Sequence, residues 1–300
     1  MFKRLLIAII IAAWGLAAGN PAAAKPVPHV VILVSLDGFR ADYLERGVTP
    51  NLSRLAADGV SAAMRPSFPT KTFPNHWTLV TGKTPDHHGI VANRMEDPAR
   101  PGETFTMAND DPFWWNAAEP IWVAAERAGI HAATMFWPGA NVAWGGTKAR
   151  GSSTARGGIR PSDWQQYNQA VSNSQRVNAV LDWMRRPPAT RPRLVTIYFD
   201  TVDTAGHDFG PGDPRTTAAI HDIDGSIGQL TSGLKARKIN ADLVIVADHG
   251  MAATASDQAG TRWVIAAAAC RWRRPRAAGC RASDSPPRSV PRRSSARASA

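Results

Sequence analysis

Cysteine is scarce in this sequence: the 300 residues include two, Cys270 and Cys280, both close to the C-terminal end. A disulfide framework across the preceding residues is therefore excluded, although these two cysteines could pair with each other in an oxidising compartment. No cysteine accompanies the N-terminal apolar segment, which argues against a lipid-anchored lipoprotein. Long apolar runs are also missing after that segment, so we expect no membrane span in the rest of the chain.

Acidic residues are nearly absent from the C-terminal end. Residues 261–300 contain ten arginines but only one acid, Asp284, and so carry +9 of the total net charge of +11. Residues 1–260 are nearly neutral at +2, which argues against a body that binds nucleic acid.

The C-terminal tail, residues 256–300, is rich in Arg, Ala, Pro and Ser and has almost no apolar periodicity. Such a composition cannot bury a core, so we expect this tail to be disordered. One interpretation is a basic arm for membranes or nucleic acid. We favour a shifted reading frame, because the composition changes abruptly after a strand that ends in metal-ligating residues. The tail would then not be the domain's own ending.

A secretory signal peptide is predicted for residues 1–24. Two basic residues precede an apolar run from Leu5 to Ala18, and small residues before Lys25 form a cleavage site. The alternative is a membrane anchor, but the run is short for a span. We therefore expect a secreted protein, periplasmic if bacterial, with one folded domain over residues 25–255.

Strand-like and helix-like segments alternate along this domain. Apolar, β-branched runs predict buried strands, whereas amphipathic runs bounded by Pro or Gly predict helices. The predicted strands are residues 30–36, 131–136, 194–199 and 241–247, and the predicted helices are 50–58 (with Thr49 as N-cap), 120–128, 176–184 and 216–234. Residues 96–118 are predicted to be a loop and 139–160 a surface loop. This alternation predicts an α/β fold with a mainly parallel sheet.

Metal-ligating side chains follow three of the predicted strands. Asp37 follows the first, Asp203 and His207 follow the third, and Asp248 and His249 follow the last. Sites in such folds form beyond the carboxyl ends of the strands, so we expect these residues to converge. Carboxylates and imidazoles suit zinc, and their number exceeds the needs of one tetrahedral ion, which favours two ions. Any one of these motifs alone is more often a turn.

Thr72 is expected at a helix N-terminus, because Pro74 and an apolar run follow it. Unpaired N–H groups and the helix dipole favour an anion at such a position. A threonine hydroxyl held there can attack phosphorus once its proton is removed. For this segment alone, a threonine that merely caps the helix is the alternative.

Six short segments form a specific combination: Thr70–His76, Thr81–Gly82, His88–Val91, Glu119–Trp122, Phe136–Gly139 and Asp248–Met251. Together they resemble the nucleotide pyrophosphatase/phosphodiesterase family, which belongs to the alkaline phosphatase superfamily. The resemblance covers about residues 28–255. It implies an alkaline-phosphatase-like fold, with helices on both faces of the sheet, and two Zn²⁺ ions.

The resemblance also implies roles for individual residues. Thr72 matches the nucleophile, and Asn93 matches the residue that helps to hold a phosphate oxygen. Asp37, Asp248 and His249 match the ligands of the zinc that holds the nucleophile, and Asp203 and His207 match ligands of the other zinc. Phe73, Tyr167 and Tyr198 lie where the family packs aromatic rings on a nucleobase.

The family's last zinc ligand is a histidine far downstream, and no histidine follows His249 in these 300 residues. We therefore expect this chain to hold at most one zinc tightly and to be catalytically impaired.

The resemblance implies hydrolysis of nucleotide phosphodiester or pyrophosphate bonds through a covalent phospho-threonine, with AMP and pyrophosphate as the products from ATP. A sulfatase is disfavoured because no Cys-x-Pro-x-Arg motif precedes the helix. A phosphomonoesterase, a phosphonoacetate hydrolase and an enzyme for lipid-type phosphodiesters remain as alternatives. A non-catalytic remnant that binds nucleotide or one zinc is the alternative from outside the enzymes.

Overall fold

The computed structural model describes residues 29–253, which are built around a five-stranded sheet of order β5–β4–β6–β1–β7. Every pairing in this sheet is parallel. Its strands are β1 (Val30–Leu36), β4 (Ala132–Met135), β5 (Asp163–Gln165), β6 (Leu194–Phe199) and β7 (Ala241–Val246). The predicted α/β fold with a mainly parallel sheet is thus confirmed, whereas the predicted signal peptide and tail lie outside the described residues.

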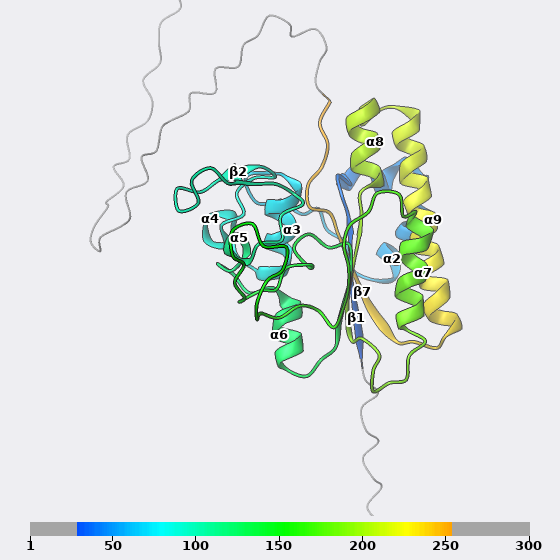
Figure 1. The fold of residues 1–300 in the computed structure, drawn as a ribbon. Coiled ribbons are helices and arrows are strands. Elements are labelled where there is room, and N and C mark those ends of the chain that lie inside the picture. The colour runs from blue at the N-terminus through cyan, green and yellow to red at the C-terminus, as the bar shows by residue number, and fades with distance from the viewer. Residues whose placement is uncertain (1–28, 254–300) are drawn as a thin grey trace, which may run out of the picture. The chain divides into compact units, whose positions relative to one another are not determined.

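Helices cover both faces of the sheet (Figure 1). One layer contains α2 (Pro50–Asp58), α7 (Asn173–Trp183) and α9 (Pro214–Ala236), and the opposite layer contains α3 (Thr72–Thr81), α4 (Pro85–His88), α5 (Pro112–Trp115) and α6 (Ile121–Arg127). The remaining elements are the 3₁₀ helix η1 (Ala41–Arg46), α8 (Thr201–Phe209) and a two-stranded antiparallel ribbon of β2 (Met95–Glu96) and β3 (Thr104–Phe105). Among residues 29–253, no helix has the length and apolar character needed to cross a membrane.

Strand β1 supplies side chains to a separate core on each face of the sheet. Ile32 and Val34 belong to the core that includes Ile220 and Ile227 of α9. Leu33, which points the other way, belongs to the core around Trp77 of α3. This alternation follows from the two-residue period of a strand, and burial on both faces explains the continuous apolar run that predicted β1.

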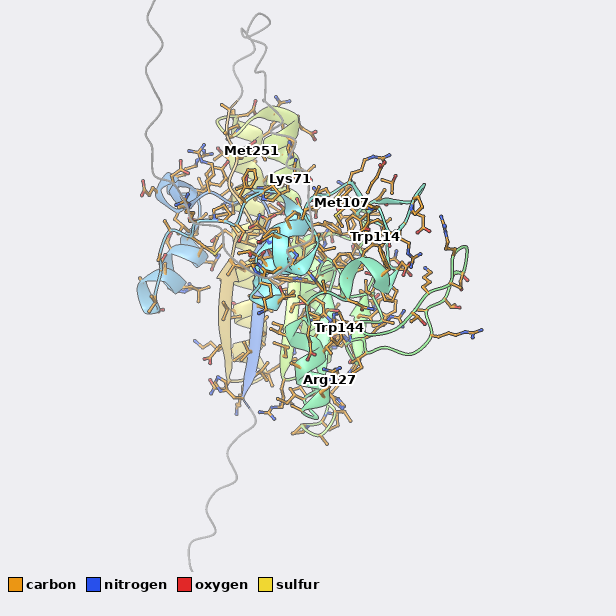
Figure 2. All side chains as sticks on the ribbon, turned by 90° about the vertical axis from the view of Figure 1, so that its left-hand side faces the viewer. Lys71, Met107, Trp114, Arg127, Trp144 and Met251 are labelled. Carbon is orange, nitrogen blue, oxygen red and sulfur yellow. The ribbon has the colours of Figure 1, made fainter. Side chains whose placement is uncertain are left out.

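The core under α3–α6 is mostly aromatic. The rings of Trp77 and Trp115 meet edge to face at 4.8 Å, and Trp122 lies 5.7 Å from Trp77. At the rim of this layer the guanidinium of Arg127 lies 5.2 Å from the ring of Trp144 (Figure 2). This packing holds α3, whose first residue is Thr72, against the sheet.

The N-terminus of α2 is capped by a distant residue. The side chain of Thr49 makes no capping hydrogen bond, contrary to the sequence-based prediction. Instead, buried Asp224 of α9 accepts hydrogen bonds from the backbone N–H groups of Leu52 at 2.8 Å and Asn51 at 3.1 Å. The carboxylate satisfies two N–H donors and also complements the helix dipole, which Thr49 could not do.

Several other predictions need correction. Residues 241–247 were expected to form a buried strand, but β7 has one neighbour, β1, within the described part of the chain, and Val244 is 45% exposed. The loop predicted at 96–118 contains α5 and parts of the β2–β3 ribbon. The predicted surface loop at 139–160 buries Val142 in the aromatic core. Strand β5 and helix α8 were not predicted at all.

Candidate metal and active site

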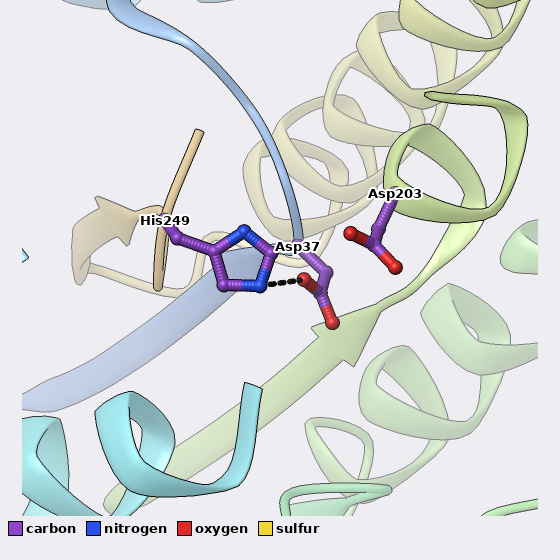
Figure 3. A group of neighbouring side chains, drawn as sticks. All are labelled: Asp37, Asp203 and His249. Carbon is purple, nitrogen blue, oxygen red and sulfur yellow. Dashed lines mark ion pairs between the residues drawn. The ribbon is translucent and has the colours of Figure 1, made fainter. Parts of the chain in front are cut away.

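Three of the predicted ligands converge at the carboxyl end of the sheet. Asp37 directly follows β1, His249 follows β7, and Asp203 lies in the first turn of α8 (Figure 3). One ligand atom from each lies within 4.8 Å of the other two, and His249 Nε2 is 3.4 Å from Asp37 Oδ1. Parallel pairing of β1 with β7 and with β6 brings these distant segments to one edge.

Buried carboxylate oxygens at this edge lack hydrogen-bond partners. Oδ1 of Asp37, Oδ1 of Asp203 and Oδ2 of Asp248 make no hydrogen bond among the described residues. Most buried polar atoms in proteins have such a partner, and an unpaired charge is costly to bury. The donor set of carboxylates and imidazole matches a divalent cation such as zinc, which would supply the missing partner.

The electrostatics of the cluster also favour a cation. Burial, together with the charges of Asp248 and Asp203, holds the pKa of Asp37 well above its ordinary value. Burial raises the pKa of Asp248 to about 7 and also raises that of Asp203. Crowded, desolvated carboxylates resist ionisation, and a nearby cation reverses that effect.

His249 is held in the orientation that a metal ligand needs. Its Nδ1 lies 2.9 Å from the carbonyl oxygen of Gly250, which can only accept a hydrogen bond, so Nδ1 carries a hydrogen. In the neutral ring Nε2 is then the lone-pair nitrogen. It faces Asp248 Oδ2 at 3.2 Å as well as Asp37. Such second hydrogen bonds typically fix the tautomer of ligating histidines.

His207 lies further out than the other predicted ligands. Its Nε2 is 3.5 Å from Asp203 Oδ1, and its side chain is 69% exposed. The two residues are four positions apart on α8 and therefore share one helix face. The structure thus gathers all five predicted ligands at one edge, whereas their division between two ions remains a prediction.

Thr72 is the first residue of α3, as predicted, and is half-buried. The backbone N–H of the next residue, Phe73, donates to Asn93 Oδ1 at 3.0 Å, so Asn93 caps this helix from a distant loop. Asn93 and the start of α3 therefore lie side by side. We expected the N–H groups at this helix start to bind an anion. The N–H of Phe73 instead donates its hydrogen bond to Asn93.

The three predicted substrate-binding aromatics differ in exposure. Phe73 is buried and packs against Phe105 and Trp115. Tyr198 is also buried, and its hydroxyl donates to Asp37 Oδ2 at 2.6 Å. Tyr167 is 45% exposed, and its hydroxyl donates to Asp200 Oδ2 at 2.7 Å. Among these three, Tyr167 offers the most open ring face.

Sequence reasoning assigned no role to two residues that shape the site. Gly38, which follows Asp37, has φ +67° and packs against Asp203. His76, in the middle of α3, is fully buried beside Asp248. The glycine carried a signal in its position directly after a strand-end aspartate, but an Asp-Gly pair is usually only a turn.

Comparison with known proteins decides the family. The model of the type I phosphodiesterase/nucleotide pyrophosphatase family matches residues 31–271. The chain belongs to this family. An uncharacterized pyrophosphatase/phosphodiesterase of Schizosaccharomyces pombe is 41% identical over 235 residues, which cover 76% of this chain and 46% of that protein. The bis(5'-adenosyl)-triphosphatase of Xenopus laevis is 36% identical over 262 residues, which cover 86% of this chain and 55% of the relative.

Solved structures of this family share the fold. Murine ectonucleotide pyrophosphatase/phosphodiesterase 5, in an inactive threonine-to-alanine form in complex with AMP, matches with a TM-score of 0.69 and 35% identity. The match covers 76% of this chain and 59% of the murine one. The predicted alkaline-phosphatase-like fold is thereby confirmed. The chain spans only about a quarter to just over half the length of the curated relatives that it matches.

Proposed function

We propose that this site hydrolyses phosphodiester and pyrophosphate bonds of nucleotides, with zinc as cofactor and Thr72 as the nucleophile. The observation that carries the proposal is the convergence of Asp37, Asp203 and His249, with buried carboxylate oxygens that accept no hydrogen bond among the described residues. Thr72 begins the helix whose buried His76 lies 3.4 Å from Asp248. A hydroxyl at a helix N-terminus beside a cation site suits attack on a phosphoryl group.

The relatives support a nucleotide substrate. The murine protein was solved with AMP, and the Xenopus relative is named for the hydrolysis of a triphosphate bridge between two adenosines. The murine form described as inactive carries an alanine in place of a threonine. These properties belong to longer proteins, and we extend them to this chain as part of the proposal.

The residues that would hold zinc follow from the geometry and from the family resemblance. We assign Asp37, Asp248 and His249, with the Thr72 hydroxyl, to one ion, and Asp203 with His207 to a second. Zinc held there would lower the pKa of the threonine hydroxyl and offset the charge of the phosphoryl oxygens. Each of the three aspartates has one carboxylate oxygen without a hydrogen bond, which is available to bind the ion.

The chain's own residues would divide the reaction into two displacements. Thr72 Oγ1 forms a bond to phosphorus while the bond to the leaving oxygen breaks, and the hydroxyl proton passes to solvent. Water then attacks the phospho-threonine, and Thr72 Oγ1 leaves and regains a proton. Asn93, which is fixed by its bond to the Phe73 N–H, would direct its amide Nδ2 to a phosphoryl oxygen. Loss of such a donor typically costs about 10²–10³ in rate.

The nucleobase is assigned to the aromatic side of the site. Tyr167 provides the exposed ring, and it packs at 5.6 Å against Phe136 and at 6.0 Å against Tyr198. Tyr198 lies under this ring, whereas Phe73 is buried against Phe105 and Trp115, so Tyr167 would make the main contact with the base. An acyl chain could use the same rings, so a lipid-type diester is an outcome that the experiment below distinguishes.

The 300 residues alone are expected to turn over little substrate, because no histidine follows His249. The experiment therefore uses an intact version of this domain that includes the downstream histidine, and compares its zinc-loaded wild type with three variants on the nitrophenyl ester of thymidine monophosphate. We expect Thr72→Ala to abolish turnover, Thr72→Ser to retain part of it, and Thr70→Ala to be mild. Thr70→Ala is the matched control, because Thr70 lies two residues before the helix start. Turnover that survives in Thr72→Ala but is lost in Thr70→Ala would contradict the assignment.

Two further measurements separate the alternatives. ATP should yield AMP and pyrophosphate, and a choline phosphodiester should be hydrolysed more slowly than the nucleotide diester. The reverse preference would support a lipid-type substrate. Binding of nucleotide or one zinc without Thr72-dependent turnover would instead support a non-catalytic protein.

We also propose that the protein is exported. The bovine and human relatives are named ectonucleotide pyrophosphatase/phosphodiesterases, and these names agree with the predicted signal peptide. Mass spectrometry of exported protein should show Lys25 at the N-terminus. A mature chain that retains residues 5–18 would instead indicate an anchor.

A further inference from the structure

The side chain of His76 lies fully buried between three segments that carry the site. Its Nδ1 is 2.7 Å from the carbonyl oxygen of Thr72 and 3.4 Å from Asp248 Oδ2. Its Nε2 is 2.8 Å from Ser35 Oγ in β1, two residues before Asp37. The imidazole of His76 thus contacts the backbone of Thr72, the strand that leads to Asp37, and the carboxylate of Asp248.

The partners of His76 determine where its hydrogen lies. The Thr72 carbonyl can only accept a hydrogen bond, so Nδ1 carries the hydrogen and donates it. Nε2 then accepts the hydroxyl hydrogen of Ser35. Both ring nitrogens are therefore satisfied without any charge on the ring, as a fully buried group requires.

The ring is also held by its neighbours. Trp137 and Tyr198 meet it edge to face at centroid distances of 5.2 and 5.0 Å. Trp137 Nε1 donates to the His76 carbonyl at 3.4 Å, and the Tyr198 hydroxyl donates to Asp37. Rotation of the ring would break both of its hydrogen bonds and this packing. The direction of its Nδ1–H towards Thr72 is therefore held in place.

We propose that His76 is a positioning residue, whose Nδ1–H holds the first turn of α3 so that the Thr72 hydroxyl stays in register with the ligands Asp37 and Asp248. Ser35 assists by holding the opposite side of the ring. This inference rests on the proposed function, because it names the group that orients the nucleophile. His76 itself touches neither substrate nor metal in this role.

The rival explanation is that His76 only fills the core. Two substitutions separate the explanations, because each keeps one of the two nitrogen positions. His76→Asn places an amide near Nδ1 and can still donate to the Thr72 carbonyl. His76→Gln places its amide near Nε2 and can still meet Ser35, but it cannot reach Thr72. Asparagine leaves the larger cavity, so a role in packing alone predicts that His76→Asn is the more damaged variant.

Positioning predicts the opposite order. A reacting group misplaced by about 1 Å can lose about 10² in rate, so His76→Gln should lower kcat about 100-fold with little change in KM. His76→Asn should retain kcat within about tenfold of wild type although it is the less stable protein. His88→Gln is the control: His88 is equally buried, but it contacts Thr78 and Pro74, and its replacement should leave kcat unchanged.

Vanadate binding gives a readout that does not depend on turnover. Vanadate forms a five-coordinate adduct with a nucleophilic hydroxyl, and ⁵¹V NMR measures its affinity for the zinc-loaded protein. We expect Thr72-dependent binding in wild type, at least a tenfold weaker affinity in His76→Gln, and near-normal affinity in His76→Asn and His88→Gln. The ¹³C shifts of the His76 ring should also report the Nδ1–H tautomer.

The outcomes keep the two proposals apart. Absence of diester hydrolysis in wild type would count against the proposed function alone, provided that vanadate binding is Thr72-dependent and follows the expected order. Equal losses in His76→Asn and His76→Gln, an Nε2–H tautomer, or vanadate binding that does not depend on Thr72 would overturn the positioning role.

Discussion

Gly38 packs directly against Asp203: a Cβ at position 38 would lie 3.0 Å from the Cα, Cβ and Oδ1 atoms of Asp203. The backbone at Gly38 also has φ +67°, which side chains other than glycine rarely adopt. The N–H of Gly38 donates to Asp248 Oδ1 at 3.2 Å. This one glycine therefore contacts two of the carboxylates assigned to zinc.

We predict that Gly38→Ala weakens zinc binding by at least tenfold, because the new methyl group must displace the Asp203 carboxylate. Isothermal titration of the metal-free protein with zinc measures the change. Gly47→Ala is the matched control, since Gly47 has a similar φ of +73° but nothing within 4 Å of the added Cβ. A similar loss of zinc affinity in both variants would mean that backbone strain, not displacement of Asp203, is responsible.

Tyr198→Phe should weaken zinc binding without unfolding the protein. The variant removes only the hydroxyl that donates to Asp37 Oδ2 and so leaves that carboxylate free to rotate. Losses of about 10–100-fold in metal affinity are typical when a group that orients a ligand is removed. The same titration gives the affinity, and circular dichroism checks the fold. Unchanged affinity would show that Asp37 is held by its other neighbours.

Asp224→Ala should lower the free energy of unfolding by about 1–3 kcal/mol, because it leaves the buried N–H groups at the start of α2 without an acceptor. Urea denaturation gives the change. The control is Thr49→Val, which removes the hydroxyl at the N-cap position but keeps the volume, and should be nearly neutral. A larger loss in Thr49→Val than in Asp224→Ala would restore Thr49 as the functional cap.

His88 should make the protein less stable in mild acid. Burial lowers the pKa of His88 from 6.5 to about 4, so the unfolded chain takes up the proton first as the pH falls. The free energy of unfolding that His88 contributes is complete above pH 6.5 and decreases as the pH falls towards 4, by about 3 kcal/mol in all.

The measurement compares wild type with His88→Gln by urea denaturation at several pH values. The advantage of wild type over the variant should shrink as the pH is lowered from 7 to 4. His87→Gln, which removes an exposed histidine from the same short helix, should leave the pH dependence of wild type unchanged. A constant difference between wild type and His88→Gln across this range would refute the prediction.

The fold was largely predictable because its signals are local. The apolar run of β1 and the Pro50 start of α2 depend on burial and backbone preference within a few residues, and both appear at the predicted positions. The errors lie where a distant partner decides. Asp224 replaces the expected Thr49 cap, and β7 is half-exposed although its composition resembles that of a central strand.

The convergence of the predicted ligands was predictable for a topological reason. Residues that follow parallel strands must meet at one edge, so Asp37 and His249 could be paired without coordinates. Orientation could not be predicted in this way. The role of Tyr198 as a donor to Asp37, and that of His76 beside Thr72, depend on which way each side chain points. Strand and helix periodicity leave that direction open until the layers have packed.

The meeting of β1 and β7 also has a consequence for biogenesis. Asp37 is made early in translation and His249 late, so the proposed ion could not be held by both until β7 has paired with β1 in the register that aligns Val34 with Ile245. A shift of one residue would move β7, and with it the segment that carries His249, by about 3.3 Å relative to Asp37, and would turn the β7 side chains to the opposite face. Under the proposed function, zinc affinity would therefore depend on the strand register, and only chains with the correct alignment of β1 and β7 would bind the ion tightly.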